Sequence, residues 1–335
     1  MSVRLAWCLI AVFITGFAVD AEAGAALDSI RDRDRLICGV SADAPGLSRR
    51  DAQGHYRGFE ADMCRAVAAA ILGSAEKVEF RSIDTIQNLI ADPDIDIVFH
   101  GLTWTFARES GLDMRFGPIV FYDGQSFLVK RKLSAKNLGQ LLGRTVCVQG
   151  DSDFMLTLQR AYRERKMVLK AKPFKTLKAA EEAFFSGECD ALTADATELA
   201  AILIGGTPNP DDFMILPDRI SKEPLAPLTR RDDDDLFDVV QWTFFALVNA
   251  EELGVTALNV DGMKGSDDPR VRNFLAASSE RAGLKVGWTG VVIHAIGNYG
   301  EIYDHNFGDM SAAKLDRSLN DLWTRGGLML TPPFK

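Results

Sequence analysis

The cysteines are the residues whose spacing points most directly to a chemistry. Cys8 lies in an apolar run near the N-terminus, and four others are spread over the body of the chain. Cys38 ends a strand-like run, Cys64 follows it in a helical run, and Cys147 and Cys189 repeat this order. We therefore expect two disulfides in an oxidising compartment, Cys38–Cys64 and Cys147–Cys189, with reduced buried thiols as the alternative. These cysteines are too widely spaced for a zinc site of the CxxC type.

The other reactive residues form no pattern that is typical of a catalytic or metal site. Residues 92–96 (DPDID) resemble a calcium loop, but Ile97 replaces the required glycine and Thr103 the bidentate glutamate. Residues 232–235 are four aspartates that open a helix, where carboxylates suit the positive end of the dipole. The motifs GxGxxG, GxxxxGK[ST], HExxH and GxSxG are absent. The sequence therefore predicts no metal, no cofactor and no enzyme. The four histidines lack close ligand spacing: His55, His100, His294 and His305.

Composition excludes several classes of protein. The 335 residues are 47% hydrophobic and 25% charged, which is ordinary for a globular chain of about two domains. The formal charge of −9 argues against nucleic acid or an acidic membrane surface as a partner. Residues 5–19 form an apolar run, and Ala21 and Ala23 supply the small side chains of a signal-peptidase site. We expect residues 1–23 to be a signal peptide and the mature protein to be periplasmic; a retained anchor is the alternative.

The hydrophobic pattern predicts an α/β protein with two lobes. Strand-like runs at 36–40, 77–80 and 95–99 alternate with helical runs at 59–72 and 85–90. The same strand–helix alternation recurs between 145 and 193, which implies two parallel-type sheets covered by helices. The chain is expected to cross between lobes near Lys130 and again near Glu223. This gives a first lobe of residues 24–130 and 223–335, and a second lobe of residues 131–222.

An ordered set of motifs resembles a known family. They are LICGV (36–40), GFEADMCRAVAAA (58–70), TWT (103–105), FYDGQ (121–125), VCVQ (146–149), ISKEPL (220–225), WTFFALVNAEELGVT (242–256), GNYGE (297–301), LNDLW (319–323), GGL (326–328) and PP (332–333). Each motif is weak alone, but together they cover nearly the whole mature chain in order. The chain resembles the periplasmic solute-binding proteins of polar amino-acid ABC transporters, in particular the general L-amino-acid subgroup.

The resemblance implies a two-lobed periplasmic-binding-protein fold that closes on an amino acid and delivers it to a membrane permease. A monomer is expected. By position, Arg108 would hold the α-carboxylate in paired hydrogen bonds, and Asp195 would hold the α-ammonium. Alternatively, Arg108 is a surface cation near Glu109 and Asp195 a helix N-cap. The remaining residues expected at the site are Thr103, Trp104, Thr105, Ser152 and Asp153.

Two segments depart from the subgroup. The loop 150–154 reads GDSDF, where a small residue, Gly and several Thr are usual. Asp151 and Asp153 would repel a ligand carboxylate, and Asp153 is placed to cap the following helix itself. Residues 100–102 read HGL in place of Arg-Asn-Thr, and the helical run 85–90 is short and lacks the usual arginine. These changes favour a more cationic ligand, or one without an α-carboxylate.

Two other functions remain open from the sequence. One is a sensor or accessory binding protein that has lost transport. The other is an enzyme on the same fold that resembles the periplasmic cyclohexadienyl dehydratases, with Asp151, Asp153 or His100 as its acid or base.

Overall fold

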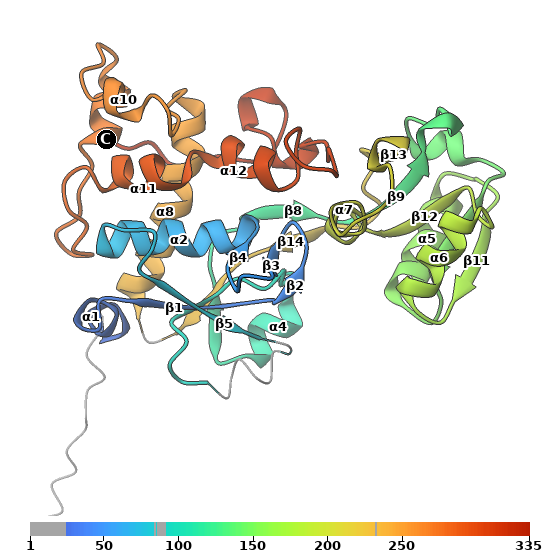
Figure 1. Ribbon diagram of the computed structural model, residues 1–335, viewed down its shortest axis with the longest axis horizontal. Helices are drawn as coiled ribbons and strands as arrows, with labels where there is room; N and C mark the ends of the chain where they lie inside the picture. Colours follow the sequence, from blue (N-terminus) through green and yellow to red (C-terminus); the bar gives the residue numbers. More distant parts are fainter. Residues whose placement is uncertain (1–24, 84, 86–91, 232) are drawn as a thin grey trace, which may run out of the picture.

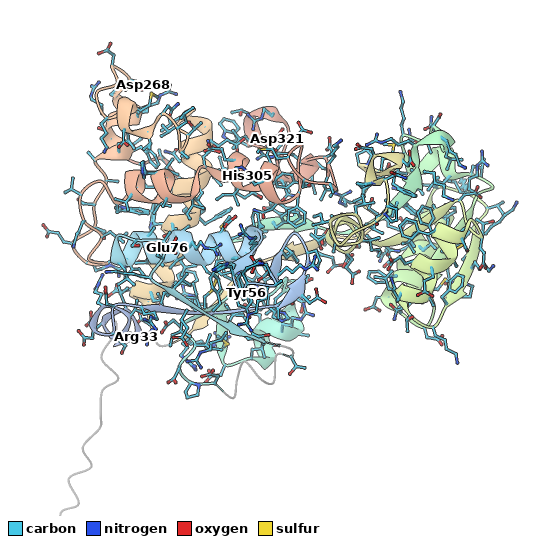
Figure 2. All side chains as sticks on the ribbon, viewed as in Figure 1. Arg33, Tyr56, Glu76, Asp268, His305 and Asp321 are labelled. Atoms are coloured by element: carbon cyan, nitrogen blue, oxygen red, sulfur yellow. A yellow bond between two sulfur atoms is a disulfide. The ribbon has the colours of Figure 1, made fainter. Side chains whose placement is uncertain are left out.

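The chain folds into two lobes joined by two extended segments (Figure 1). The computed structural model describes residues 25–83, 85, 92–231 and 233–335. The predicted signal peptide lies outside these residues, as does nearly all of the helix expected at 85–90. Figure 2 shows the side chains of both lobes, with Tyr56 and His305 both in the first lobe.

The first lobe is built on a five-stranded sheet of order β5-β1-β6-β15-β7. Its strands are β1 (Leu36–Val40), β5 (Val78–Ser82), β6 (Ile97–Val98), β7 (Met114–Phe116) and β15 (Leu228–Arg230). β1 is buried at all five positions, as expected for a central strand covered on both faces. β1 runs parallel to β5 and β6, whereas β15 runs antiparallel to β6 and β7.

The second lobe repeats this arrangement with the order β11-β10-β12-β9-β13. The strands are β9 (Gln125–Lys130), β10 (Thr145–Gln149), β11 (Lys170–Phe174), β12 (Ala191–Asp195) and β13 (Phe213–Ile215). β10 is parallel to β11 and β12, and β9 is antiparallel to β12 and β13. Both sheets are therefore mixed: the strands of the predicted strand–helix alternation run parallel, and the added strands β9 and β15 run antiparallel to them.

The two lobes are connected by β8 (Phe121–Asp123) and β14 (Glu223–Leu225), which pair antiparallel as a two-stranded hinge. The double crossover is as expected, but the first crossing lies earlier in the chain. Residues 125–130, which we assigned to the first lobe, are hydrogen-bonded in the second sheet. An apolar run identifies a strand, whereas the sheet it joins depends on which partner strands it pairs with.

Helices cover both sheets. The first lobe contains α1 (Ala25–Asp32), α2 (Phe59–Leu72), α4 (Phe106–Gly111), α8 (Asp234–Glu252), α9 (Val260–Met263), α10 (Pro269–Leu275), α11 (Trp288–Ile296) and α12 (Tyr299–Asn306). The second lobe contains α5 (Asp153–Glu164), α6 (Leu177–Ser186) and α7 (Ala196–Ile204). A small sheet of β2 (Asp43–Ala44), β3 (Ser48–Arg50) and β4 (Tyr56–Arg57) precedes α2. Single 3-10 turns complete the elements: η1 (Arg131–Leu133), η2 (Leu138–Leu141), η3 (Pro210–Asp212), η4 (Ser318–Asn320) and η5 (Trp323–Arg325).

Both predicted disulfides are present. Cys38–Cys64 fastens β1 to α2, and Cys147–Cys189 fastens β10 to the residues just before β12. All four cysteines are buried. Each bond therefore crosslinks a central strand to its own lobe, and neither spans the hinge.

The part of the chain after α8 supports the hinge. Asn320 accepts a hydrogen bond from the Tyr122 N–H and donates one to its carbonyl, and the Tyr299 hydroxyl donates to the Val120 carbonyl. Lys314 Nζ and Asp211 Oδ1 form an ion pair of 2.5 Å between the lobes. Among the described residues, no helix is long and apolar enough to cross a membrane.

Candidate functional site

A cavity of about 850 Å³ lies between the lobes beside the hinge. Residues 43–47 of the first lobe, which follow the end of β1, form one wall. Thr197 and Glu198, which follow the end of β12, contribute to the other wall together with α6. Ligands of two-lobed α/β proteins bind at such carboxyl ends of strands. The full lining is Asp43, Ala44, Pro45, Leu47, Leu177, Lys178, Glu181, Glu182, Phe185, Thr197, Glu198, Ala201, Ile202, Gly205, Gly206, Thr207 and Pro208.

Arg108 is held in place by the segment that precedes it. Thr105 is the N-cap of α4, and its Oγ1 accepts the Arg108 N–H at 3.2 Å. The guanidinium donates from Nη1 to the Thr103 carbonyl at 2.8 Å. This half-buried side chain makes no other hydrogen bond to the described residues, so its remaining N–H groups are free to bind a carboxylate.

Thr103 and Trp104 connect this segment to the hinge. The Trp104 N–H donates to the Pro224 carbonyl at 2.8 Å, and Thr103 forms an isolated bridge with Leu225. The Trp104 ring stacks on Phe116 with centroids 5.7 Å apart and is 39% exposed. The indole can therefore present one face to a ligand while the other is packed.

Asp195 ends β12 and takes the N-cap position of α7, but its side chain does not cap that helix. Its Oδ1 is buried and has no hydrogen-bond partner among the described residues. Burial, together with the negative charges of Asp123, Glu198 and Glu223, raises the pKa of Asp195 to about 8, against the effect of Arg219. A cationic group beside Asp195 would therefore relieve both the missing hydrogen bond and the charge repulsion.

Asp123 is the buried partner in this acidic group. Its carboxylate accepts hydrogen bonds from the Gly124 N–H at 2.8 Å and from the Thr197 hydroxyl at 2.5 Å. Burial raises its pKa, while these hydrogen bonds and Arg219 oppose the rise. Asp123 thus bonds the hinge to the start of α7, whereas Asp195 has a carboxylate oxygen without a hydrogen-bond partner among the described residues.

The loop 150–154 differs from our expectation. Ser152, not Asp153, is the N-cap residue of α5, and no side chain caps the helix. The Ser152 hydroxyl instead donates to the Gln149 carbonyl at 2.6 Å. Asp153 is the first residue within the helix, so it does not take the N-cap position from which it was expected to cap the backbone N–H groups. Asp151 and Asp153 are exposed, and both line a pocket of about 520 Å³ on the second lobe.

The structure divides the predicted site residues between the lobes. Thr103, Trp104, Thr105 and Arg108 form one continuous segment of the first lobe. Ser152, Asp153 and Asp195 follow the ends of β10 and β12 in the second lobe. No hydrogen bond or ion pair in the described part of the chain joins the two groups. His100, the other departure from the subgroup, is engaged with the Ile83 carbonyl through Nε2 at 2.5 Å.

The sequence did not identify several acidic residues around these positions. Asp123 lies in the FYDGQ motif and Glu223 in ISKEPL, but the residue pattern gives no role to either acid. Glu198 follows Asp195 by three residues and could have been found from that spacing. Their mutual effect depends on long-range packing across the hinge, which local spacing does not reveal.

Comparison with known proteins identifies the family. The model of the bacterial extracellular solute-binding proteins, family 3, matches residues 36–256. The chain is a family 3 bacterial extracellular solute-binding protein. Membership confirms the predicted location outside the cytoplasm. The matched range ends within the turn after α8, so the hinge-supporting residues after α8 lie beyond the family model.

This solute-binding protein has relatives that match almost its whole length. It is 37% identical to the general L-amino acid-binding periplasmic protein AapJ of Rhizobium johnstonii, over 95% of this chain and 96% of the relative. It is 35% identical to the glutamate/glutamine/aspartate/asparagine-binding protein BztA of Rhodobacter capsulatus, over 97% of each chain. A periplasmic binding protein from Brucella ovis, solved with glutathione bound, is 36% identical with a TM-score of 0.76. The match covers 92% of this chain and 99% of that one.

Proposed function

We propose that this protein is the substrate-binding component of an ABC transporter, which binds an amino acid or a related small polar solute between its lobes and delivers it to a membrane permease. The observation that carries the proposal is that the first lobe offers a cation and the second an acid without a hydrogen-bond partner. Arg108 in the first lobe offers free guanidinium N–H groups, and Asp195 in the second offers a buried oxygen without a partner. We expect a zwitterion bound between the lobes to bond to Arg108 through its carboxylate and to Asp195 through its ammonium group.

The uncapped start of α5 supports the same ligand chemistry. With no side chain capping its first turn, this helix presents backbone N–H groups and the positive end of its dipole, which favour a carboxylate. The relatives named above are described as binding general L-amino acids, acidic amino acids with their amides, and glutathione. All of these carry an ammonium and at least one carboxylate, so the proposed site fits their shared chemistry.

Around Asp195 the charge is strongly negative. Asp123, Glu198 and Glu223 all act on its pKa, and Arg219 is the cation that opposes them. On the cavity wall Asp43, Glu181 and Glu182 add further acids to a single Lys178. We therefore expect ligands with extra positive charge to bind more tightly than acidic ones.

A thermal-shift panel tests the proposal. Protein freed of bound ligand by unfolding, dialysis and refolding is mixed with amino acids, polyamines and glutathione, each at several concentrations. A ligand at 100 times its Kd stabilises the folded protein by about 2.7 kcal/mol. Binding of at least one amino-acid-like solute is expected, together with weaker binding in Arg108→Ala and in Asp195→Asn. If no member of the panel shifts the melting curve, the proposed function fails.

The raised pKa of Asp195 is also what a general acid requires, and this favours a second candidate, a hydrolyase-type enzyme acting on a cyclic acid. Product analysis separates the two. Each ligand that binds is incubated with the protein and recovered, and recovery of unchanged ligand supports a binding protein. Turnover that Asp195→Asn abolishes would support the enzyme.

A further inference from the structure

Glu60 is a buried acid that no step of the proposed function uses. It is the second residue of α2 and is 4% exposed. Its Oε1 accepts a hydrogen bond from the Gly101 N–H, while its Oε2 is buried without a partner among the described residues. Burying a carboxylate costs free energy unless it is hydrogen-bonded. The Gly101 N–H is the donor that stabilises the charge of Glu60 among the described residues.

Three segments of the first lobe meet at this residue. The Phe59 and Glu60 N–H groups donate to the Gly46 and Leu47 carbonyls at 2.9 and 2.8 Å, and Leu47 lines the cavity between the lobes. Gly101 has a φ of +58°, and a Cβ there would lie 3.2 Å from Leu47 Cδ1. The start of α2 thus holds the loop before β3 through its backbone and the loop after β6 through its carboxylate.

The loop after β6 leads directly to Arg108. From Gly101 the chain continues to Leu102, whose carbonyl accepts the Ala226 N–H at 3.1 Å. It then reaches Thr103, whose carbonyl orients the Arg108 guanidinium. The segment is therefore anchored at one end by Glu60 and along its length by the strand that leaves the hinge.

We propose that Glu60 is a positioning residue of the binding site, whose carboxylate holds the Gly101 amide and so sets the place of the Thr103 carbonyl and of the Arg108 guanidinium. This role rests on the proposed function, because it acts through the residue that would bind the ligand carboxylate. It predicts that affinity depends on the charge of a side chain that does not touch the ligand.

Ionisation of Glu60 gives the proposal a specific signature. Burial raises its pKa to about 7, and the Gly101 N–H opposes the rise. The charged groups on the packed segments are Asp62 and Arg65 on α2, His100 and Arg108 on the loop, and Asp43 before β3. None of these is a cause of that shift. Below about pH 7 Glu60 becomes neutral and its charge-assisted bond to Gly101 weakens.

The test compares Glu60→Gln with the native protein at about pH 6 and about pH 8. At about pH 8 the variant is expected to bind a carboxylate ligand about fivefold more weakly, because an amide oxygen is a weaker acceptor than a carboxylate. At about pH 6 the two are expected to bind alike, since native Glu60 is then largely neutral. Asp195 is present in both proteins, so its own pH dependence cancels in the ratio.

Asp62→Asn is the matched control, because Asp62 is in the same helical turn but bonds Arg65 and Asn306. It should leave affinity within about twofold at both pH values. Two results would show that Glu60 has a merely structural role. One is an equal loss of affinity in Asp62→Asn, and the other is a ratio of native to Glu60→Gln affinity that is the same at both pH values.

A second measurement needs no ligand. In the native protein the Gly101 amide NMR resonance should titrate with a midpoint near pH 7, and this titration should vanish in Glu60→Gln. If Gly101 titrates and the Arg108 Nε–H resonance moves with it while no ligand is found, the proposed function fails and the positioning role stands. If a ligand binds but Glu60→Gln changes neither resonance nor affinity, the positioning role fails and the proposed function stands.

Discussion

Asp195 lies beside Asp123, and the negative charge of Asp123 is, after burial, the strongest cause of its raised pKa of about 8. In the empty site Asp195 is therefore largely protonated at neutral pH. An ammonium group favours the ionised carboxylate, so ligand binding must lower this pKa and release a proton. Affinity is expected to rise as the pH increases from about 6 to about 8 and then to level off. Calorimetry in buffers of different ionisation enthalpy measures the released proton, and Asp195→Asn should release none.

The raised pKa of Asp195 also affects folding stability without ligand. Stability is expected to fall as the pH rises, whereas affinity is expected to rise. The pKa is raised from an ordinary value of 3.8 to about 8, so the folded state binds a proton that the unfolded chain gives up. The stabilisation is complete below about pH 4 and is lost as the pH rises through about 8. The melting temperature should fall less steeply with pH in Asp195→Asn than in the native protein. An identical slope in both would contradict the raised pKa.

Arg108 should matter for binding far more than for folding. Within the described part of the chain its guanidinium makes one hydrogen bond, to the Thr103 carbonyl. Replacing it with Ala is expected to weaken carboxylate ligands at least about tenfold while leaving the melting temperature almost unchanged. Arg108→Lys keeps the charge but not the paired donors, so it should recover only part of the affinity. Full recovery by Lys would show that the charge alone is needed.

The two exposed aspartates of the loop 150–154 should weaken the binding of neutral amino acids. Asp151 has a φ of +47°, so Gly is well suited to that position. The double change Asp151→Gly and Asp153→Thr is expected to raise affinity for a neutral amino acid by about threefold to tenfold, with a smaller gain at high salt. Glu164→Gln, at the exposed far end of the same helix, is the control for net charge. No gain in titration calorimetry would show that this loop does not set specificity.

Each disulfide should stabilise its own lobe. The bonds close loops with sequence separations of 26 and 42 residues, which correspond to roughly 3.5 and 4 kcal/mol in the chain-entropy estimate. Paired Cys→Ser changes should lower the free energy of unfolding by about these amounts in urea. Peptide mapping of the native protein should find no thiol in these four positions.

The local pattern predicted those parts of the fold that depend on neighbouring residues. The apolar run 36–40 is β1 with the expected bounds, and the alternation expected from residue 145 begins there with β10. The directions of β9 and β15 were not predicted, because each enters its sheet only after the chain has crossed the hinge. The direction of such a strand depends on the path of the chain between the lobes. The residues of the strand itself do not indicate that direction.

The candidate site was predicted from the same kind of local signal. Arg108 was chosen because it follows a strand and the motif 103–105, and Asp195 because it lies at the end of a strand; their roles in binding stay predictions. The prediction for Asp153 was wrong because α5 begins one residue earlier than expected. Asp153 is therefore the first helical residue and not the N-cap. Glu60 was missed because its chemistry comes from contact with Gly101, which is remote in sequence. An acid in the first turn of a helix is ordinary until its burial is known.

The position of β15 has a consequence for the order in which the lobes can form. β15 lies inside the first sheet, between β6 and β7, yet it follows the whole second lobe in the chain. As the polypeptide emerges from the export machinery, residues 125–215 can complete their sheet and the Cys147–Cys189 bond while the first sheet still lacks an inner strand. Truncated chains ending before residue 228 should therefore contain a protease-resistant second lobe and a protease-sensitive first lobe. The second lobe would then fold first, and the first would close around a hinge that is already attached to a finished domain.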